Sequence, residues 1–161
     1  MKSLSKVLIF LLLAFQIISV QAQNRPDPQP APDTYESFKL GIAGYTFAKF
    51  DLEKTLETLQ RTDVHYLCIK NFHLPLTSSD DEIKAFHALL KSADVTGYAV
   101  GPLYMNTKEE VDQVFDYAKR VGVKTIVGVP TYDLLPYVNN KVAEFDMNYA
   151  IHLHGPDIDK F

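Results

Sequence analysis

Residues 97–129 read GYAVGPLYMNTKEEVDQVFDYAKRVGVKTIVGV, and this stretch decides the class of fold. Two mostly apolar runs, 97–103 and 124–129, flank a segment whose apolar residues recur at helical spacing. That segment opens with Thr107 and Glu110, which have the spacing of a capping box at a helix N-terminus. The stretch therefore predicts a strand, a helix and a second strand, in that order.

The same strand–helix unit recurs along the chain. The strands that we expect lie at 38–47, 64–70, 97–103, 124–129 and 147–152. Helices are expected from Leu52, after a second capping box at Ser79, after Thr107, and within 132–145. The apolar stripe of the helix after Ser79 consists of Ile83, Phe86, Leu89 and Leu90. Because the strands lack polar alternation, both of their faces should be buried in a parallel sheet that helices cover.

Two α/β architectures fit this alternation: a doubly wound open sheet and a TIM barrel. The Gly41-Ile42-Ala43-Gly44 segment lies inside the first expected strand and opens no helix, so we reject a dinucleotide-binding fingerprint. Long polar and aromatic turns after the strands favour the barrel, whose sites are built from such turns. A complete barrel needs roughly 200 residues or more. We therefore expect a partial TIM (β/α)8 barrel of about five strands and four helices that ends after the fifth strand.

The N-terminus has the pattern of a secretory signal peptide. Lys2 and Lys6 precede an apolar core at 7–20, and small residues stand at positions −3 and −1 before Gln23. The apolar core is shorter than the roughly 20 residues that a membrane-spanning helix needs, so we expect cleavage rather than anchoring. The protein should then be secreted or periplasmic, with residues 1–22 removed and no membrane attachment.

After the signal peptide we expect a proline-rich linker at 23–36 and a single domain at 37–161. Cys68 is the only cysteine, so no internal disulfide can hold the domain and a hydrophobic core must do so. The formal net charge of −4 becomes −6 when the two signal-peptide lysines are removed. A mildly acidic domain has no electrostatic attraction to nucleic acid or anionic lipid.

Polar and aromatic residues follow the expected strands, where a barrel builds its site. The candidates for contact with a small polar ligand such as a sugar are Tyr45, Lys70, His73, Tyr104, His152 and His154. His152 and His154 lie two residues apart and should share a face, and imidazole both binds metals and carries protons. Each candidate also has a structural interpretation, such as loop fixing by His73. We expect His65 and His87 to be structural or exposed.

Three of these strand ends resemble a known family. Lys70-Asn71-Phe72-His73-Leu74-Pro75-Leu76, Val127-Gly128-Val129-Pro130 and Ile151-His152-Leu153-His154-Gly155-Pro156 are similar, in this order and spacing, to the sugar phosphate isomerase/epimerase family. Its members are xylose isomerase-like TIM barrels, and the resemblance covers about 39–157.

The resemblance implies a divalent metal (Mn, Mg, Co or Zn) that holds adjacent sugar oxygens while a carboxylate or histidine moves a proton between neighbouring carbons. It implies that His152 is a metal ligand and catalytic residue, because many members have a metal-binding glutamate at that position. From their places at the strand ends, rather than from the resemblance, we expect His154 to be a second catalytic residue and Lys70, His73, Tyr45 and Tyr104 to bind substrate. The family's later ligands, on strands six to eight, have no counterpart in this sequence.

We therefore expect a metal-dependent sugar or sugar phosphate isomerase/epimerase that works through an enediolate, incomplete and inactive as this chain alone. Two other classes stay open: a non-catalytic carbohydrate-binding half-barrel, and a lyase or hydrolase of oxidised sugars. Unpaired edge strands also favour a homo-oligomer.

The signal-peptide pattern predicts that the exported protein begins at Gln23, which leaves 139 of the 161 residues. N-terminal sequencing of protein recovered from the periplasm or medium checks this. A mature chain that begins at Met1 would show that the apolar core is not cleaved.

Overall fold

The computed structural model describes residues 38–153. The predicted signal peptide, the linker at 23–36 and His154 lie outside the described residues. The chain divides into two units, Met1–Phe38 and Lys39–Phe161, and the described helices and strands all belong to the second unit. Within the described range, the helices are too short or too polar to cross a membrane.

The second unit is a parallel five-stranded sheet with helices between its strands. The strands are β1 (Gly41–Ala43), β2 (Tyr66–Ile69), β3 (Thr96–Met105), β4 (Thr125–Pro130) and β5 (Asn148–Ile151). The α-helices are α2 (Leu52–Arg61), α3 (Asp80–Ser92), α4 (Lys108–Val121) and α5 (Leu135–Phe145). Two 3-10 turns, η2 (Gly44–Phe47) and η3 (Tyr132–Leu134), follow β1 and β4.

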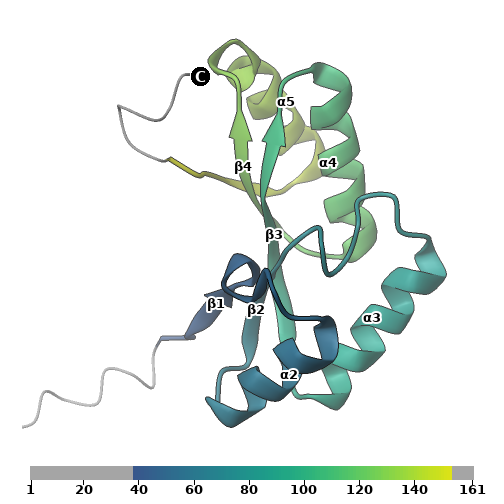
Figure 1. Cartoon of the computed structure of the whole chain (residues 1–161). Helices are drawn as coiled ribbons and strands as arrows, with labels where there is room; N and C mark the ends of the chain where they lie inside the picture. Colours follow the sequence, from purple (N-terminus) through teal and green to yellow (C-terminus); the bar gives the residue numbers. More distant parts are fainter. Residues whose placement is uncertain (1–37, 154–161) are drawn as a thin grey trace, which may run out of the picture. The chain divides into compact units, whose positions relative to one another are not determined.

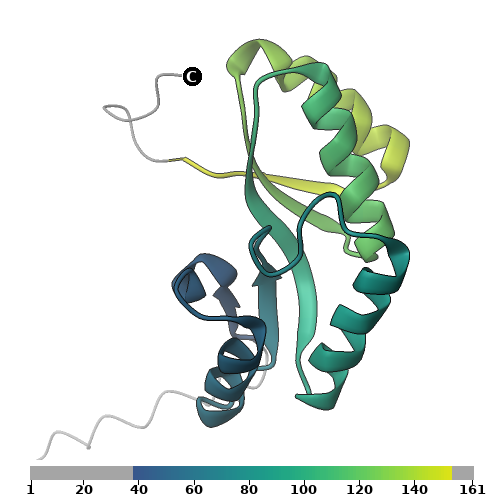
Figure 2. The same ribbon diagram turned by 45° about the vertical axis from the view of Figure 1, so that its right-hand side comes forward.

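The strand order decides between the two architectures that the sequence left open. The sheet runs β1-β2-β3-β4-β5, and every neighbouring pair is parallel. Because strand–helix–strand crossovers are right-handed, a sequential order places successive helices on one face of the sheet. The helices lie on one side of the strands in Figures 1 and 2. A doubly wound sheet would reverse its order at a switch point. The predicted partial TIM-barrel fold is therefore confirmed.

The two predicted capping boxes form to different extents. Before α3, the Ser79 hydroxyl accepts from the Glu82 backbone N–H at 3.3 Å, and the Glu82 carboxylate accepts from the Ser79 N–H at 2.7 Å. Before α4, Thr107 accepts from the Glu110 N–H at 3.2 Å, but the Glu110 carboxylate accepts from the Asn106 N–H at 2.6 Å. Both arrangements satisfy backbone donors that a helix start leaves unpaired.

Two details differ from the sequence-based expectations. The first expected strand, 38–47, is reduced to β1, because the chain turns into η2 where Gly44 meets β2. A Cβ atom on Gly44 would lie 2.6 Å from the Cys68 carbonyl oxygen, so this close approach requires glycine. Leu89, expected in the apolar stripe of α3, is 50% exposed, whereas its three partners in that stripe are buried.

The hydrophobic core lies between the sheet and the helices. Phe115 of α4 is fully buried and stacks on Tyr149 of β5, with ring centroids 6.2 Å apart. Tyr117, also in α4, is buried and donates its hydroxyl to the Leu74 carbonyl at 2.7 Å. One helix thus joins the last strand to the turn that follows β2.

The two histidines expected to be structural hold elements together away from the strand C-termini. His87 Nε2 lies 2.9 Å from the Val121 carbonyl oxygen and links α3 to the end of α4. His65 Nδ1 lies 2.9 Å from the Asp94 carbonyl oxygen, and its Nε2 lies 3.1 Å from Asp63 Oδ1. Both partners of His65 are acceptors, so both ring nitrogens must carry protons. The hydrogen bonds to Asp94 and Asp63 accordingly raise the pKa of His65.

This geometry predicts that His65 stabilises the fold only while it is protonated. Its folded pKa lies above the unfolded value of about 6.5, so the stabilisation is complete below that pH and is lost as pH rises through the folded pKa. Urea unfolding of wild type and His65→Gln should show the larger difference in midpoint at pH 5.5 and a smaller one at pH 9. Asp94→Asn should reduce the same difference. Equal differences at both pH values would contradict a charged His65.

Candidate functional site

The C-terminal ends of the parallel strands gather polar residues at one edge of the sheet. We call Tyr45, Lys70, Tyr104, Thr131 and His152 the rim residues; each lies at or just after the end of a different strand. The polar side chains of a TIM-type barrel act from this edge.

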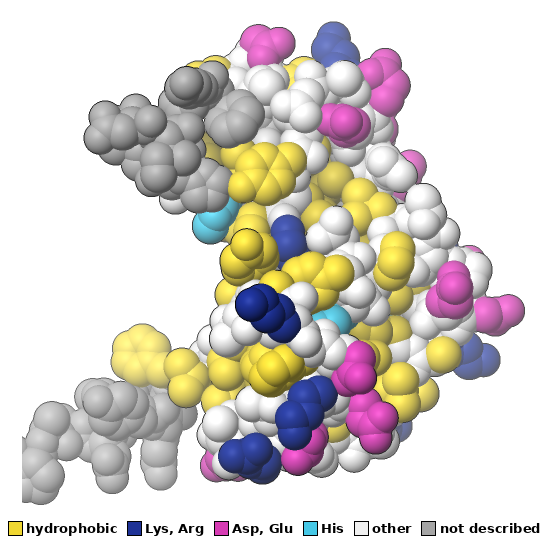
Figure 3. Space-filling view, viewed as in Figure 1, with side chains coloured by type: hydrophobic (Ala, Val, Ile, Leu, Met, Phe, Trp, Pro, Cys, Tyr) yellow, Lys and Arg dark blue, Asp and Glu magenta, His cyan; other side chains and the backbone are white. Residues whose placement is uncertain are grey.

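Strand alternation places Lys70, Tyr104 and His152 on the sheet face opposite the helices, which we call the inner face. In β2, Ile69 belongs to the core beneath the helices, so the following residue, Lys70, points the other way. In β3 the core residues Leu103 and Met105 flank Tyr104. Hydrophobic side chains gather along the open side of the sheet in Figure 3, while acidic side chains lie mainly around the helices.

Lys70 is the most unusual of the rim residues. Its side chain is a charged group that is only 8% exposed, and its ammonium donates to the Pro102 carbonyl oxygen. Burial lowers the pKa of Lys70 below its usual value, because a desolvated ammonium is costly. Cys68, two residues earlier, shares the inner face and donates its thiol to the Gly101 carbonyl at 3.5 Å.

Glycines in two neighbouring segments create the site around Lys70. The β2–β3–β4 ladder is irregular where Gly101 has φ 129°, and the pairing of β3 with β4 shifts between Val100 and Leu103. A Cβ atom on Gly101 would overlap the Val127 carbonyl oxygen. On the other side, a Cβ atom on Gly44 would lie 3.0 Å from the Lys70 Cβ, so the glycine lets η2 approach the lysine closely. These close approaches bury a lysine that the sequence places at a strand end.

His73 fixes the turn after β2 to the start of α2. The Thr55 hydroxyl donates to the Asp51 carbonyl at 2.7 Å, so it accepts from His73 Nε2 at 3.2 Å. The Phe50 carbonyl lies at the same distance from Nε2. Nδ1 is buried and has no hydrogen-bond partner among the described residues. The ring is therefore neutral with its proton on Nε2, and burial lowers its pKa.

The side chains of the other predicted site residues at the rim differ in how exposed they are. Tyr45 is 66% exposed in η2 and Tyr104 is 50% exposed in β3. His152 is half-buried, and its backbone N–H donates to the Gly128 carbonyl at 2.9 Å, which extends the ladder past β5. The structure brings Lys70, Tyr104 and His152 to one face, whereas the partners of His73 lie in α2 and the preceding loop. His154 lies outside the described residues, so its pairing with His152 stays a prediction.

Thr131 is a rim residue that the sequence analysis did not single out. It follows β4, and its Oγ1 is buried with no hydrogen-bond partner within residues 38–153. An unsatisfied buried hydroxyl at a strand end is a candidate contact for a ligand. The available signal was its place directly after the Val129-Pro130 strand end.

The described residues do not form a metal centre by themselves. Between residues 38 and 153, no three His, Cys, Asp or Glu side chains converge in a way that could hold a metal ion. His152 offers one imidazole, and the Lys70 ammonium, which lies on the same face, would repel a metal rather than bind it. A structural or catalytic site usually needs at least three protein ligands.

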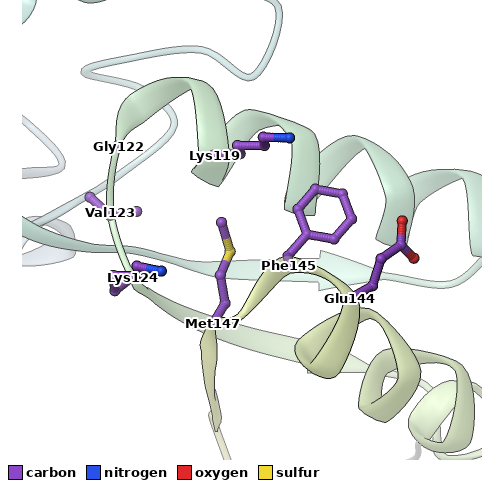
Figure 4. Close-up of a pocket in the computed structure, with 7 residues that line it drawn as sticks. All are labelled: Lys119, Gly122, Val123, Lys124, Glu144, Phe145 and Met147. Carbon is purple, nitrogen blue, oxygen red and sulfur yellow. The ribbon is translucent and has the colours of Figure 1, made fainter.

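A well-formed hollow in the described structure lies away from the rim. It has a volume of about 340 Å³ and is lined by Lys119, Gly122, Val123, Lys124, Glu144, Phe145 and Met147. Figure 4 shows these side chains between the end of α4 and the end of α5, where β4 and β5 begin. Lys124 is paired there with Asp146 at 2.9 Å.

Comparison with solved structures shows the fold. An uncharacterised protein from Parabacteroides distasonis matches with a TM-score of 0.68 and 26% identity over 73% of this chain and 53% of its own. A xylose isomerase domain protein from Alicyclobacillus acidocaldarius matches with a TM-score of 0.54 and 14% identity over 73% of this chain and 50% of its own. A sugar phosphate isomerase/epimerase from P. distasonis matches with a TM-score of 0.54 and 11% identity over 80% of this chain and 55% of its own.

These similarities define a class of fold. The chain has the xylose isomerase-like, partial TIM-barrel fold and spans about half the length of the structures that it matches. No family model matches the sequence. No curated protein matches it either.

Because the His73 ring is neutral and buried, we predict that its contribution to the free energy of unfolding changes with pH in the opposite direction from that of His65. Its folded pKa is depressed, so its stabilisation is present above about pH 6.5 and is lost as pH falls through the folded pKa. His73→Gln should cost about 1 kcal/mol at pH 7.5 through lost hydrogen bonds. In urea unfolding, wild type should lose more stability than the variant between pH 7.5 and 5. Parallel losses would show that His73 is not held neutral.

Proposed function

We propose that this chain supplies the first half of the active site of a sugar isomerase or epimerase. The proposal is supported by the position of Lys70, Tyr104, Thr131 and His152, each at or just after the end of one of four consecutive strands of a xylose isomerase-like sheet. Solved proteins of this fold include one described as a sugar phosphate isomerase/epimerase. Polar groups converging on a strand-end edge suit a small hydroxylated ligand.

The proposed reaction moves a proton between adjacent sugar carbons through an enediolate. Such an intermediate places negative charge on oxygen, and a preorganised donor in a dry site stabilises that charge. The Tyr104 hydroxyl would be such a donor. The Lys70 ammonium would hold the ligand at the same edge of the sheet, and His152 would be the proton carrier of the set.

Metal dependence is part of this proposal. Mn, Mg, Co or Zn would bind His152, and the remaining ligands would have to come from residues beyond the described range. We also propose that the protein acts outside the cytoplasm, because its sequence has the pattern of a signal peptide. We further propose that it forms a homo-oligomer, because β1 and β5 are edge strands of the described sheet.

A carbohydrate-binding protein without catalysis is the second candidate function. It is favoured by the exposed rings that follow the strands, Tyr45 (66%), Tyr104 (50%) and Tyr132 (59%). Aromatic rings at an open edge offer apolar faces to a sugar, and a phenol hydroxyl can both donate and accept hydrogen bonds.

The proposal predicts that catalysis needs the second half of the barrel. The test joins this chain to the part of the 26% identical P. distasonis protein that it does not cover, and compares the product with the chain alone. In D2O with each divalent metal, proton NMR follows exchange of the C2 proton in a panel of aldoses and of the C1 and C3 protons in a panel of ketoses. We expect exchange by the joined protein and none by the chain alone.

The variants His152→Ala and His87→Ala are the matched pair for this assay. His152→Ala should lower exchange about a hundredfold and weaken metal binding in calorimetry, because it removes a proton carrier and a ligand. His87→Ala should change neither, since His87 joins α3 to α4. A folded joined protein that exchanges no sugar, or that is indifferent to His152→Ala, would contradict the proposal. Sugar binding without exchange would favour the carbohydrate-binding function.

A further inference from the structure

We infer that Lys70 binds a carboxylate of the ligand, so that the rim takes an acidic sugar of the uronate or aldonate class in preference to a neutral one. This inference rests on the proposed function for the sugar, and it adds the substrate class. It starts from a contrast between Lys70 and the other cations of the molecule.

The ion-paired cations are more exposed than Lys70, which has no carboxylate partner among the described residues. Carboxylates lie 2.6 Å from Lys54 and 2.9 Å from Arg120, Lys124 and Lys141. Within the described range Lys70, at 8% exposure, donates to the Pro102 carbonyl alone, although an ammonium has three N–H bonds. A buried ammonium without a counter-ion is unfavourable, and a fold retains one where an anion comes to it.

The groups that surround Lys70 cannot supply that anion. Burial raises the pKa of the Cys68 thiol to about 11, so it is neutral at physiological pH. Gly44 and Pro102, which also lie against Lys70, carry no charge. Because none of these described groups is an anion, we assign that role to the ligand.

The single ammonium also indicates which anion it is. A phosphate dianion is normally held by several donors, such as a glycine-rich loop with backbone N–H groups. Among the described residues one buried ammonium stands on its own here, and it matches the charge of one carboxylate. Tyr104 lies on the same face in the neighbouring strand β3, further along the strand than Val100, which pairs with Ile69, and there its hydroxyl can contact the sugar hydroxyls.

Calorimetry on the full chain at pH 7 tests the inference with D-glucuronate, D-glucose and D-glucose 6-phosphate as probes. We expect glucuronate to bind at least about tenfold more tightly than glucose, since a charge-assisted hydrogen bond is involved. Lys70→Met should abolish this preference, with glucuronate bound no more tightly than glucose. Lys70→Arg should retain the preference in part. Lys84→Met removes an exposed lysine of α3 and should change nothing.

Each outcome bears on the inference separately from the proposed function. Equal binding of glucose and glucuronate by folded wild type would overturn the acidic-sugar class and leave a sugar isomerase in place. Tightest binding of glucose 6-phosphate, lost in Lys70→Met, would show that the anion is a phosphate and would equally overturn it. Absence of binding of all three probes by the folded chain would overturn the acidic-sugar class, whereas the exchange assay on the joined barrel decides the proposed function. Selective glucuronate binding without proton exchange in the joined barrel would support the inference alone. Circular dichroism and the urea midpoint establish that each variant is folded.

Discussion

The sequential order of the parallel strands is the constraint on which the rest of this structure depends. Right-handed crossovers between strands that follow one another in space leave the helices on one face. That face buries the apolar core, with Phe115 and Tyr149 stacked between α4 and β5. Alternate residues of each strand point to the inner face. The residues that follow each strand lie at the C-terminal edge of the sheet.

Close backbone approaches then convert one position on the inner face into a chemical site. Gly44 brings η2 against the end of β2, and Gly101 brings the chain of β3 against the Val127 carbonyl. A side chain at either glycine would separate these segments. Together they enclose Lys70 and direct the Pro102 carbonyl to its ammonium. Within the described residues this carbonyl is the hydrogen-bond acceptor of the buried ammonium.

The sequence was sufficient for features that are local in the chain. Helical spacing and the Ser79 capping box predicted α3, and the run of apolar segments predicted a parallel sheet of the barrel type. Contacts between distant segments could not be predicted in this way. The shortening of the first strand depends on Gly44 meeting Cys68, which lies 24 residues later. The orientation of the His73 ring depends on Thr55, which lies in α2, and on Phe50, which lies before α2.

The same distinction applies to the candidate site. Parallel strands end together, so the sequence could place Lys70, Tyr104 and His152 on one edge. It could not show that Lys70 is buried, or that Thr131 Oγ1 lacks a partner among the described residues, because both depend on packing against neighbouring strands. The metal expected from the family resemblance stays a prediction, since the described residues supply a single imidazole for it.

Lys70 is a buried cation on the inner face, and the titration of its own ammonium tests this placement. In the chain labelled with 13C at lysine Cε, the resonance that disappears in Lys70→Arg identifies this residue. The account predicts a midpoint for that resonance below the usual lysine value of 10.5, because burial disfavours the ammonium. A midpoint at or above 10.5 would show that Lys70 is solvated or already paired with an anion of the chain, and would contradict the account.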